Sequence, residues 1–175
     1  MALSALINLG VKQTANSTNV KVTITNTVTV LTCALTLFYA LYFFVFLSQF
    51  DATMINLFFV IGYCFTFLFT SNNYYRAAKL WFFGIFICHI VILTTQVFSP
   101  EVGFQFYFLI LPSGVFLLFN EDERREKTTI FLLGLIAFFV CHNYQNEAPL
   151  VLLPIEIEKA IFSSSIIIVM LESFI

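Results

Sequence analysis

The stretch SPEVGFQFYFLILPSGVFLLFNEDERREKTT, residues 99–129, passes from an aromatic run to a dense cluster of charges within a few positions. Residues 104–119 contain no charged side chain, whereas all seven residues from Glu121 to Lys127 are charged. Hydrocarbon excludes charges and the aqueous side of a membrane does not, so this boundary is typical of a helix leaving a bilayer. The sequence therefore predicts that residues 104–119 lie in lipid and that residues 120–127 lie outside it.

The composition of the whole chain supports this interpretation. Of its 175 residues, 60% are hydrophobic and only 10% are charged, whereas about a quarter of the residues of a soluble domain are charged. We therefore expect an integral membrane protein whose first partner is the lipid bilayer. The net charge of −2 offers no basic surface for phosphates, which excludes nucleic acid as a partner.

Six apolar segments come close to the length of about 20 helical residues that crosses a bilayer. They are residues 27–49, 53–70, 80–98, 104–119, 128–142 and 160–175. We therefore predict an all-α fold, an integral membrane bundle of six transmembrane helices. Residues 1–25 form a cytoplasmic N-terminal segment that an amphipathic helix would suit, and residues 26–175 form the transmembrane domain.

Basic residues orient this bundle, because Lys and Arg are retained in cytoplasmic loops. With the N-terminus inside, the outer loops hold only Lys159. The cytoplasmic segments hold the other seven basic residues, which are Lys12, Lys21, Arg76, Lys79, Arg124, Arg125 and Lys127. We therefore expect both termini in the cytoplasm and a multi-pass protein of the inner (plasma) membrane.

Two loops need an interpretation in this topology. Residues 120–127 form the inner connection between the fourth and fifth helices, and we interpret them as a solvated turn, with docking of a cytoplasmic partner as the alternative. On the outer side, Pro149 and Pro154 interrupt helix formation around residues 150–153. We interpret that segment as a re-entrant or interfacial lip over the mouth of the bundle.

Polar side chains within apolar segments are costly in lipid unless they face the bundle interior. Several of them fall in the outer half of the predicted bundle, where they can converge on one cavity. The alternative for each amide is a hydrogen bond between helices that only supports packing. The candidate ligand-binding residues are Asn56, His89, Gln96, Glu101, Gln105, Tyr107 and His142.

Two further residues are candidates for a structural role near this cavity. Pro112 is expected to kink the fourth helix and so to open the bundle. Gly103 permits a backbone turn between the third and fourth helices, in the outer segment SPEVGFQ. The alternative is an ordinary tight loop at that place.

Haem binding and catalysis find little support in the sequence. His89 falls near the middle of its helix and His142 near the outer surface, and this difference in depth is unfavourable for two ligands of one porphyrin. No metal-ligand spacing, Gly-rich phosphate loop or nucleophile with an adjacent base is present. We therefore expect no cofactor, no metal and no enzymatic activity in this chain.

The order of features along the chain resembles a known family. Gly10 and Asn26 precede the first span, Gly103 lies in an outer turn, residues 106–112 form an aromatic run ending in Pro, and residues 120–127 form a charged inner turn. This succession resembles the six-transmembrane N-terminal sensor or regulatory region of bacterial membrane-bound class III adenylate or guanylate cyclases and of related sensor histidine kinases.

The resemblance implies a dimeric input module that senses a small or lipophilic ligand from the outer side and signals through its last helix to a cytoplasmic signalling domain. The chain departs from the family because it ends at Ile175 without coiled-coil heptads or a catalytic domain, so no cyclase or kinase residue can be transferred to it. A homodimer contact through helix six would use the small residues Ser163, Ser164 and Ser165, although packing within one chain explains them equally well. The alternatives are a structural or assembly subunit of a larger membrane complex and, less favoured, a haem-binding redox protein.

Overall fold

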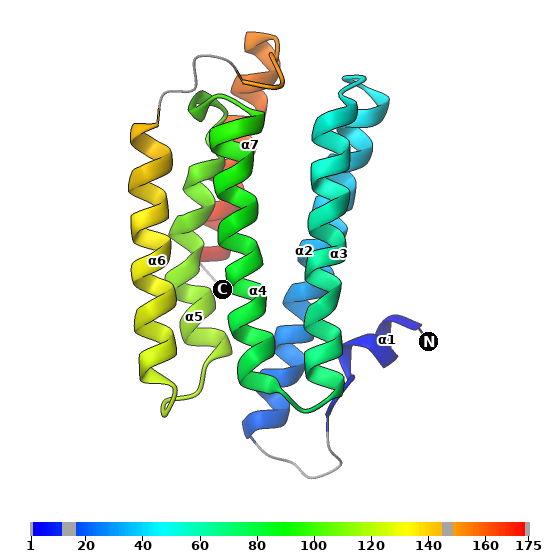
Figure 1. Ribbon diagram of the computed structural model, residues 1–175, viewed down its shortest axis with the longest axis vertical. Helices are drawn as coiled ribbons and strands as arrows, with labels where there is room; N and C mark the ends of the chain where they lie inside the picture. Colours follow the sequence, from blue (N-terminus) through cyan, green and yellow to red (C-terminus); the bar gives the residue numbers. More distant parts are fainter. Residues whose placement is uncertain (1, 12–16, 145–148, 174–175) are drawn as a thin grey trace. The chain divides into compact units, whose positions relative to one another are not determined.

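The computed structural model describes residues 2–11, 17–144 and 149–173, and all regular structure in these residues is helical (Figure 1). The α-helices are α1 (Ala2–Ile7), α2 (Ser17–Val45), α3 (Phe50–Ser71), α4 (Tyr75–Ile92), α5 (Leu111–Leu118), α6 (Arg124–Asn143) and α7 (Ile155–Ser173). Between α4 and α5 lie a π-helix, η1 (Leu93–Val97), and two 3-10 helices, η2 (Pro100–Val102) and η3 (Phe104–Ile110).

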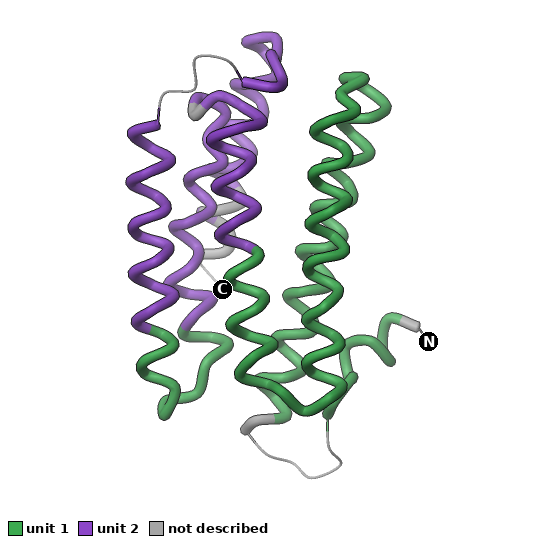
Figure 2. Tube along the Cα trace, in the orientation of Figure 1, with its two compact units in different colours: residues 1–85, 116–127 green, residues 86–115, 128–175 purple. Residues whose placement is uncertain are grey.

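The chain divides into two compact units (Figure 2). Unit 1 comprises residues 1–85 and 116–127, and unit 2 comprises residues 86–115 and 128–175. Both units therefore take residues from α4, α5 and α6.

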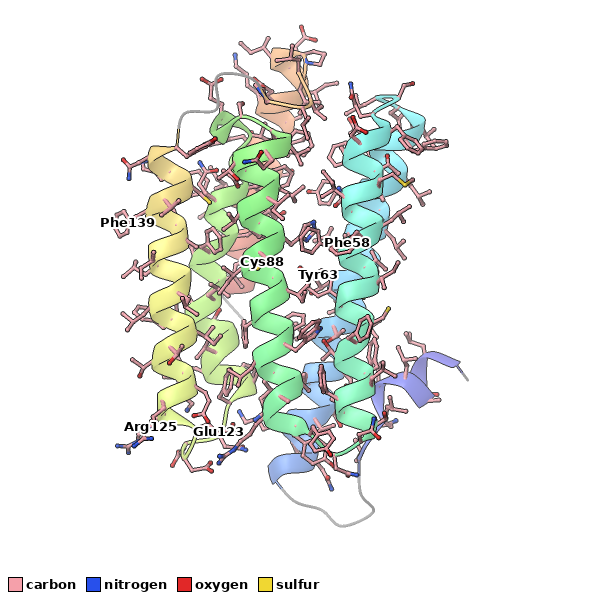
Figure 3. The ribbon with its side chains drawn as sticks, viewed as in Figure 1. Phe58, Tyr63, Cys88, Glu123, Arg125 and Phe139 are labelled. Atoms are coloured by element: carbon pink, nitrogen blue, oxygen red, sulfur yellow. The ribbon has the colours of Figure 1, made fainter. Side chains whose placement is uncertain are left out.

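Three helical stretches are long and apolar enough to cross a membrane: Asn19–Val45, Phe50–Ser71 and Tyr75–Val97. The prediction of an all-helical protein of membrane type is confirmed at this level. Large apolar side chains such as Phe38, Phe58 and Phe139 are more than half exposed, and Figure 3 labels the latter two. Exposed apolar side chains along helices of this length are consistent with contact with a lipid bilayer.

The first long helix begins earlier than expected, at Ser17 instead of residue 27. Its first turns are rich in Thr, and the hydroxyls of Thr23, Thr25 and Thr27 donate to carbonyls four residues earlier, which satisfies them within the helix. Val22 and Asn26 in these turns are buried, so tertiary packing also supports the helix. The expected domain boundary at residue 26 therefore falls inside α2.

The fourth apolar segment is a 3-10 helix followed by a short α-helix and not one continuous α-helix. Residues 104–110 are in 3-10 conformation and α-helix begins at Leu111, directly before Pro112. Proline fits the first turn of an α-helix because its missing N–H has no partner there. The structure therefore has a change of helix type at the place where a proline kink was expected.

Unit 1 is built on α2 and α3, which are joined by a short turn and pack along their length. The Thr53 hydroxyl of α3 donates to the carbonyl of Ala40 in α2 at 3.3 Å. The N-terminal part of α4 adds to the pair through Trp81, whose indole N–H donates to the Gly62 carbonyl at 2.8 Å. Tyr63 is fully buried in this unit (Figure 3).

Within unit 1, backbone groups of residues 7–10 hold the N-terminal segment against α2, α3 and the start of α4. The side-chain amide of Asn26 donates to the carbonyls of Ile7 at 3.0 Å and Leu9 at 2.9 Å. Gly10 has a φ of +76° and lies so close to the Thr70 carbonyl that a Cβ has no room. The Gly10 carbonyl also accepts a hydrogen bond from the Tyr75 hydroxyl at 2.8 Å. Gly10 and Asn26 therefore have defined structural roles.

Replacing Asn26 by Ala is expected to release the N-terminal segment. Two carbonyls lose their donor, and a buried unsatisfied polar group costs about 1–3 kcal/mol. Hydrogen exchange of residues 2–11 and thermal unfolding in detergent measure the effect. The control is Thr27→Ala, because the Thr27 hydroxyl bonds only within α2 in the described structure. Equal exchange in both variants would show that Asn26 does not hold the segment.

Candidate functional site

Unit 2 contains the most unusual backbone of the described structure, the segment Leu93–Ile110, which we call the irregular segment. It joins the π-helix η1 to two 3-10 helices, of which η3 has seven residues. Single-turn π-helices occur frequently at functional sites, and 3-10 runs longer than three or four residues are uncommon. Such a backbone persists only where its surroundings hold it, so its contacts are the first place to look for a function.

The irregular segment packs against α7 through Gly103 and Phe162. Gly103 has a φ of +84°, and a Cβ on it would lie 2.7 Å from Cδ2 of Phe162. The Phe162 ring also meets the Phe106 ring edge to face, with centroids 5.7 Å apart. The Ser99 hydroxyl donates to the Glu158 carboxylate of α7 at 3.3 Å. Gly103 is therefore required both for its backbone conformation and for the close approach of α7.

The segment between the two prolines docks on the end of η1. The backbone N–H of Leu150 donates to the Gln96 carbonyl at 3.1 Å, and that of Val151 donates to the Val97 carbonyl at 2.9 Å. The last carbonyls of a helix lack intrahelical donors, so these two bonds cap it. Val151 is buried. The predicted lip therefore has a specific backbone contact, while residues 145–148 of the same loop lie outside the described residues.

Aromatic rings connect the end of α6 with α7. The exposed His142 ring stacks on Phe138, at 5.7 Å between centroids and 6° between planes. Phe138 contacts Phe106 of η3 at 6.4 Å, and Phe106 contacts Phe162 of α7. We call these four residues the aromatic chain. It gives a continuous series of ring contacts from an exposed imidazole to α7.

The candidate residues fall into different environments. His89, Gln105 and Tyr107 are buried in unit 2, whereas Gln96, Glu101 and His142 are exposed. Asn56 belongs to unit 1, where it is buried and its side-chain amide donates to the Ala52 carbonyl of its own helix. Of these candidates, His142 takes part in the aromatic chain and Gln96 in the backbone contact with Leu150. Their convergence on one cavity stays a prediction.

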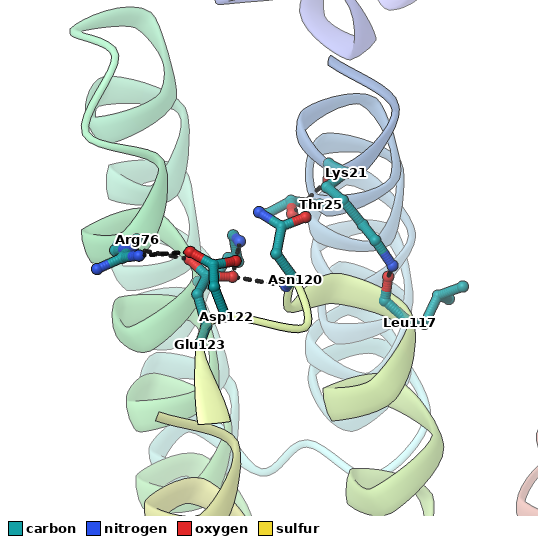
Figure 4. Close-up of polar contacts among 8 residues, drawn as sticks. Lys21, Thr25, Arg76, Leu117, Asn120, Asp122 and Glu123 are labelled. Atoms are coloured by element: carbon teal, nitrogen blue, oxygen red, sulfur yellow. Dashed lines mark hydrogen bonds and ion pairs between the residues drawn. The ribbon is translucent and has the colours of Figure 1, made fainter. Parts of the chain in front are cut away.

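Unit 1 contains a second polar site, which we call the charged cluster: Lys21, Arg76, Lys79, Asn120, Asp122 and Glu123 (Figure 4). Glu123 is buried and bonds Lys79 at 2.5 Å and Arg76 at 3.3 Å. Its carboxylate also accepts from the backbone N–H of Asn120 at 2.7 Å. Arg76 reaches Asp122 at 2.8 Å, and both of these side chains are mostly exposed. The charged turn is thus tied to the first turns of α4.

The interpretation of residues 120–127 as a solvated turn is wrong for Glu123, whose side chain is only 2% exposed. Burial is tolerated because Lys79, Arg76 and a backbone N–H together satisfy the carboxylate. One signal of the cluster was present in the sequence, since Arg76 and Lys79 lie three residues apart and share a helix face. The partner on the distant turn had no comparable signal.

The described residues contain no group of three or more His, Cys, Asp or Glu side chains that could hold a metal ion. No protein-family model matches the chain, and comparisons with curated proteins and with solved structures give no match. A function must therefore be inferred from the contacts within each unit.

Replacing Gly103 by Ala is expected to loosen α7 from the irregular segment. The new Cβ meets the Phe162 ring and the positive φ strains any L-residue, a combined cost of about 1–3 kcal/mol. Thermal unfolding in detergent measures the loss. Gly84→Ala is the matched control, because its Cβ meets nothing within 4 Å and Ala favours a helix by up to about 1 kcal/mol. A Gly103 variant as stable as the Gly84 variant would contradict the assigned contact.

Replacing Glu123 by Gln is expected to destabilise unit 1 by about 3–5 kcal/mol, because Lys79 is left buried without its carboxylate. Asp122→Asn serves as the control, since it removes a carboxylate from the exposed pair with Arg76 and should cost less than about 1 kcal/mol. Chemical denaturation of both variants in the same detergent compares them. If both variants lose a similar free energy of unfolding, the buried pair of Glu123 contributes no more than the exposed pair of Asp122, which would contradict this prediction.

Proposed function

We propose that this chain is a membrane-embedded sensory or regulatory input module. It binds a small or lipophilic ligand, or a partner, from the outer side at the irregular segment, and it passes the resulting change to a cytoplasmic signalling domain through α7. The observation that carries this proposal is the packing of α7 against the irregular segment at Gly103, Phe106 and Phe162.

The contacts of the irregular segment suit a two-state element. Its capping bonds come from a distant loop, and its contact with α7 depends on one glycine and two rings. A ligand shifts such an element only when it binds one arrangement better than the other. The exposed His142 and the aromatic chain behind it offer a place where binding changes the position of Phe106, and hence of α7.

The proposal includes six membrane crossings. Besides the three long helical stretches, η3 and α5 together form an apolar helix over Phe104–Leu118. Its 3-10 part rises more steeply than an α-helix, so the segment reaches about 26 Å. α6 has 20 residues and α7 has 19, which corresponds to about 30 and 28 Å. These lengths suit a hydrocarbon core of about 30 Å, with their charged first turns at its edge.

We also propose that both termini lie in the cytoplasm and that the protein belongs to the plasma membrane. In unit 1, contacts bring Lys21, Arg76 and Lys79 to the same end as residues 117–123. A concentration of basic residues at one end supports a cytoplasmic position for that end.

We also propose a homodimer through α7, whose Ser163, Ile167 and Met170 are exposed. The homodimer follows from the resemblance to the sensor regions of class III cyclases and sensor kinases.

The experiment joins a dimerisation-dependent class III cyclase domain after Ile175 and measures cyclic-nucleotide output in cells. Phe138→Ala interrupts the aromatic chain, so we expect a severalfold change in output. Phe131→Ala is the matched control, because it removes the same volume from an exposed side chain of α6 (42%) outside the aromatic chain, and its output should equal that of the unmodified fusion.

Membrane level and thermal unfolding are measured for every fusion, and Phe138→Leu supplies a milder variant if Phe138→Ala is poorly folded. Unchanged output in both Phe138 variants, with normal membrane levels, would contradict signalling through α7. Loss of a copurifying membrane complex in the Phe138 variants, with unchanged output, would instead favour an assembly subunit.

A further inference from the structure

The charged cluster surrounds a pocket of about 230 Å³ in unit 1. Its walls come from α2, the start of α4 and the turn before α6. The lining residues are Lys21, Val22, Tyr75, Arg76, Lys79, Asn120, Asp122 and Glu123. The aromatic chain and the irregular segment contribute no residue to it, so the pocket is independent of the site proposed for signalling.

Positive charge exceeds negative charge in this pocket. Three cations line it, and only Asp122 and Glu123 oppose them. Both carboxylates are engaged by Arg76 and Lys79. Within the described residues, the ammonium of Lys21 donates instead to the neutral carbonyl of Leu117. Lys79 and Lys127 repel this ammonium, and Glu123 attracts it less strongly, so the balance at this corner of the pocket favours an anion.

In the membrane topology proposed above, the pocket lies at the level where lipids present phosphate. Lys21 is the third residue of the apolar stretch Asn19–Val45, and Arg76 is the second of Tyr75–Val97. The ends of membrane-crossing helices lie at the level of the lipid headgroups. Basic pockets between transmembrane helices on the cytoplasmic side are a known setting for anionic headgroups.

We propose that this pocket binds a phosphate group, carried by an anionic lipid headgroup or by a phosphate-bearing solute. Lys21 and the side-chain amide of Asn120 donate to it, and Arg76 turns to it from Asp122. Arg76 keeps the bond from its Nε to Glu123. Moving its terminal nitrogen away from Asp122 costs little, because that pair is mostly exposed and such pairs contribute little to stability. Lys79 keeps its buried bond with Glu123.

The test titrates fluorescent phosphatidylglycerol into the full chain in neutral detergent and measures the Kd, with fluorescent diacylglycerol, which has no phosphate, as the uncharged probe. Lys21→Gln is expected to weaken phosphatidylglycerol binding about tenfold, because one charge-assisted hydrogen bond is lost. Lys21→Arg, which keeps a donor and a charge, should retain most of the affinity. The matched control is Arg125→Gln, since Arg125 is exposed at the start of α6 and does not line the pocket (Figure 3). It should change the Kd by less than about twofold.

Competition with inorganic phosphate separates the two sources. Displacement of the fluorescent lipid by phosphate indicates a solute phosphate site, and resistance to displacement indicates a lipid headgroup site. Equal weakening by Lys21→Gln and Arg125→Gln, or equal affinity for the two lipids, would overturn the proposal. Thermal unfolding without lipid confirms that each variant is folded. Asn120→Ala, which removes a neutral donor and should weaken binding about fivefold, replaces Lys21→Gln if that variant is not folded, since Asn120 bonds Glu123 through its backbone.

Discussion

A chain in hydrocarbon must satisfy its backbone polar groups internally, and this constraint organises the structure. The long helices satisfy it along their length, and the Thr hydroxyls of α2 bond to their own helix. The difficult places are the helix ends, where four carbonyls lack donors. At η1 the N–H groups of Leu150 and Val151 supply them. At the N-terminal segment the side chain of Asn26 donates to two carbonyls.

The charged cluster and the irregular segment differ in how firmly their contacts hold them. In unit 1, the buried carboxylate of Glu123 has three donors, so the charged cluster ties the turn to α4 at the end of the apolar helices. In unit 2, the irregular segment is held by capping bonds, one glycine contact and ring packing, which are individually weaker. The charged cluster is therefore the firmer junction, and the contact with α7 is the one more easily altered, as the proposed function requires.

Some residues were recognisable in the sequence because their chemistry is unusual in an apolar chain. Gly103 and the proline-bounded segment 150–153 stand out in this way, and the structure shows a defined contact for each. The candidate polar residues follow from the cost of polarity in lipid, which does not tell which of them become buried. His89, Gln105 and Tyr107 are buried, but Gln96, Glu101 and His142 are exposed. Burial depends on how helices pack and not on residue type alone.

The sequence by itself determined that the protein is helical and apolar enough for a membrane, because hydropathy and helix length are local properties. It also indicated where charge interrupts the apolar runs. Only the tertiary structure decided that Glu123 is buried on Lys79, 44 residues away in the chain, and that Phe162 packs on Gly103. Such pairings follow from which helix faces meet, and helix packing has several solutions for the same apolar pattern.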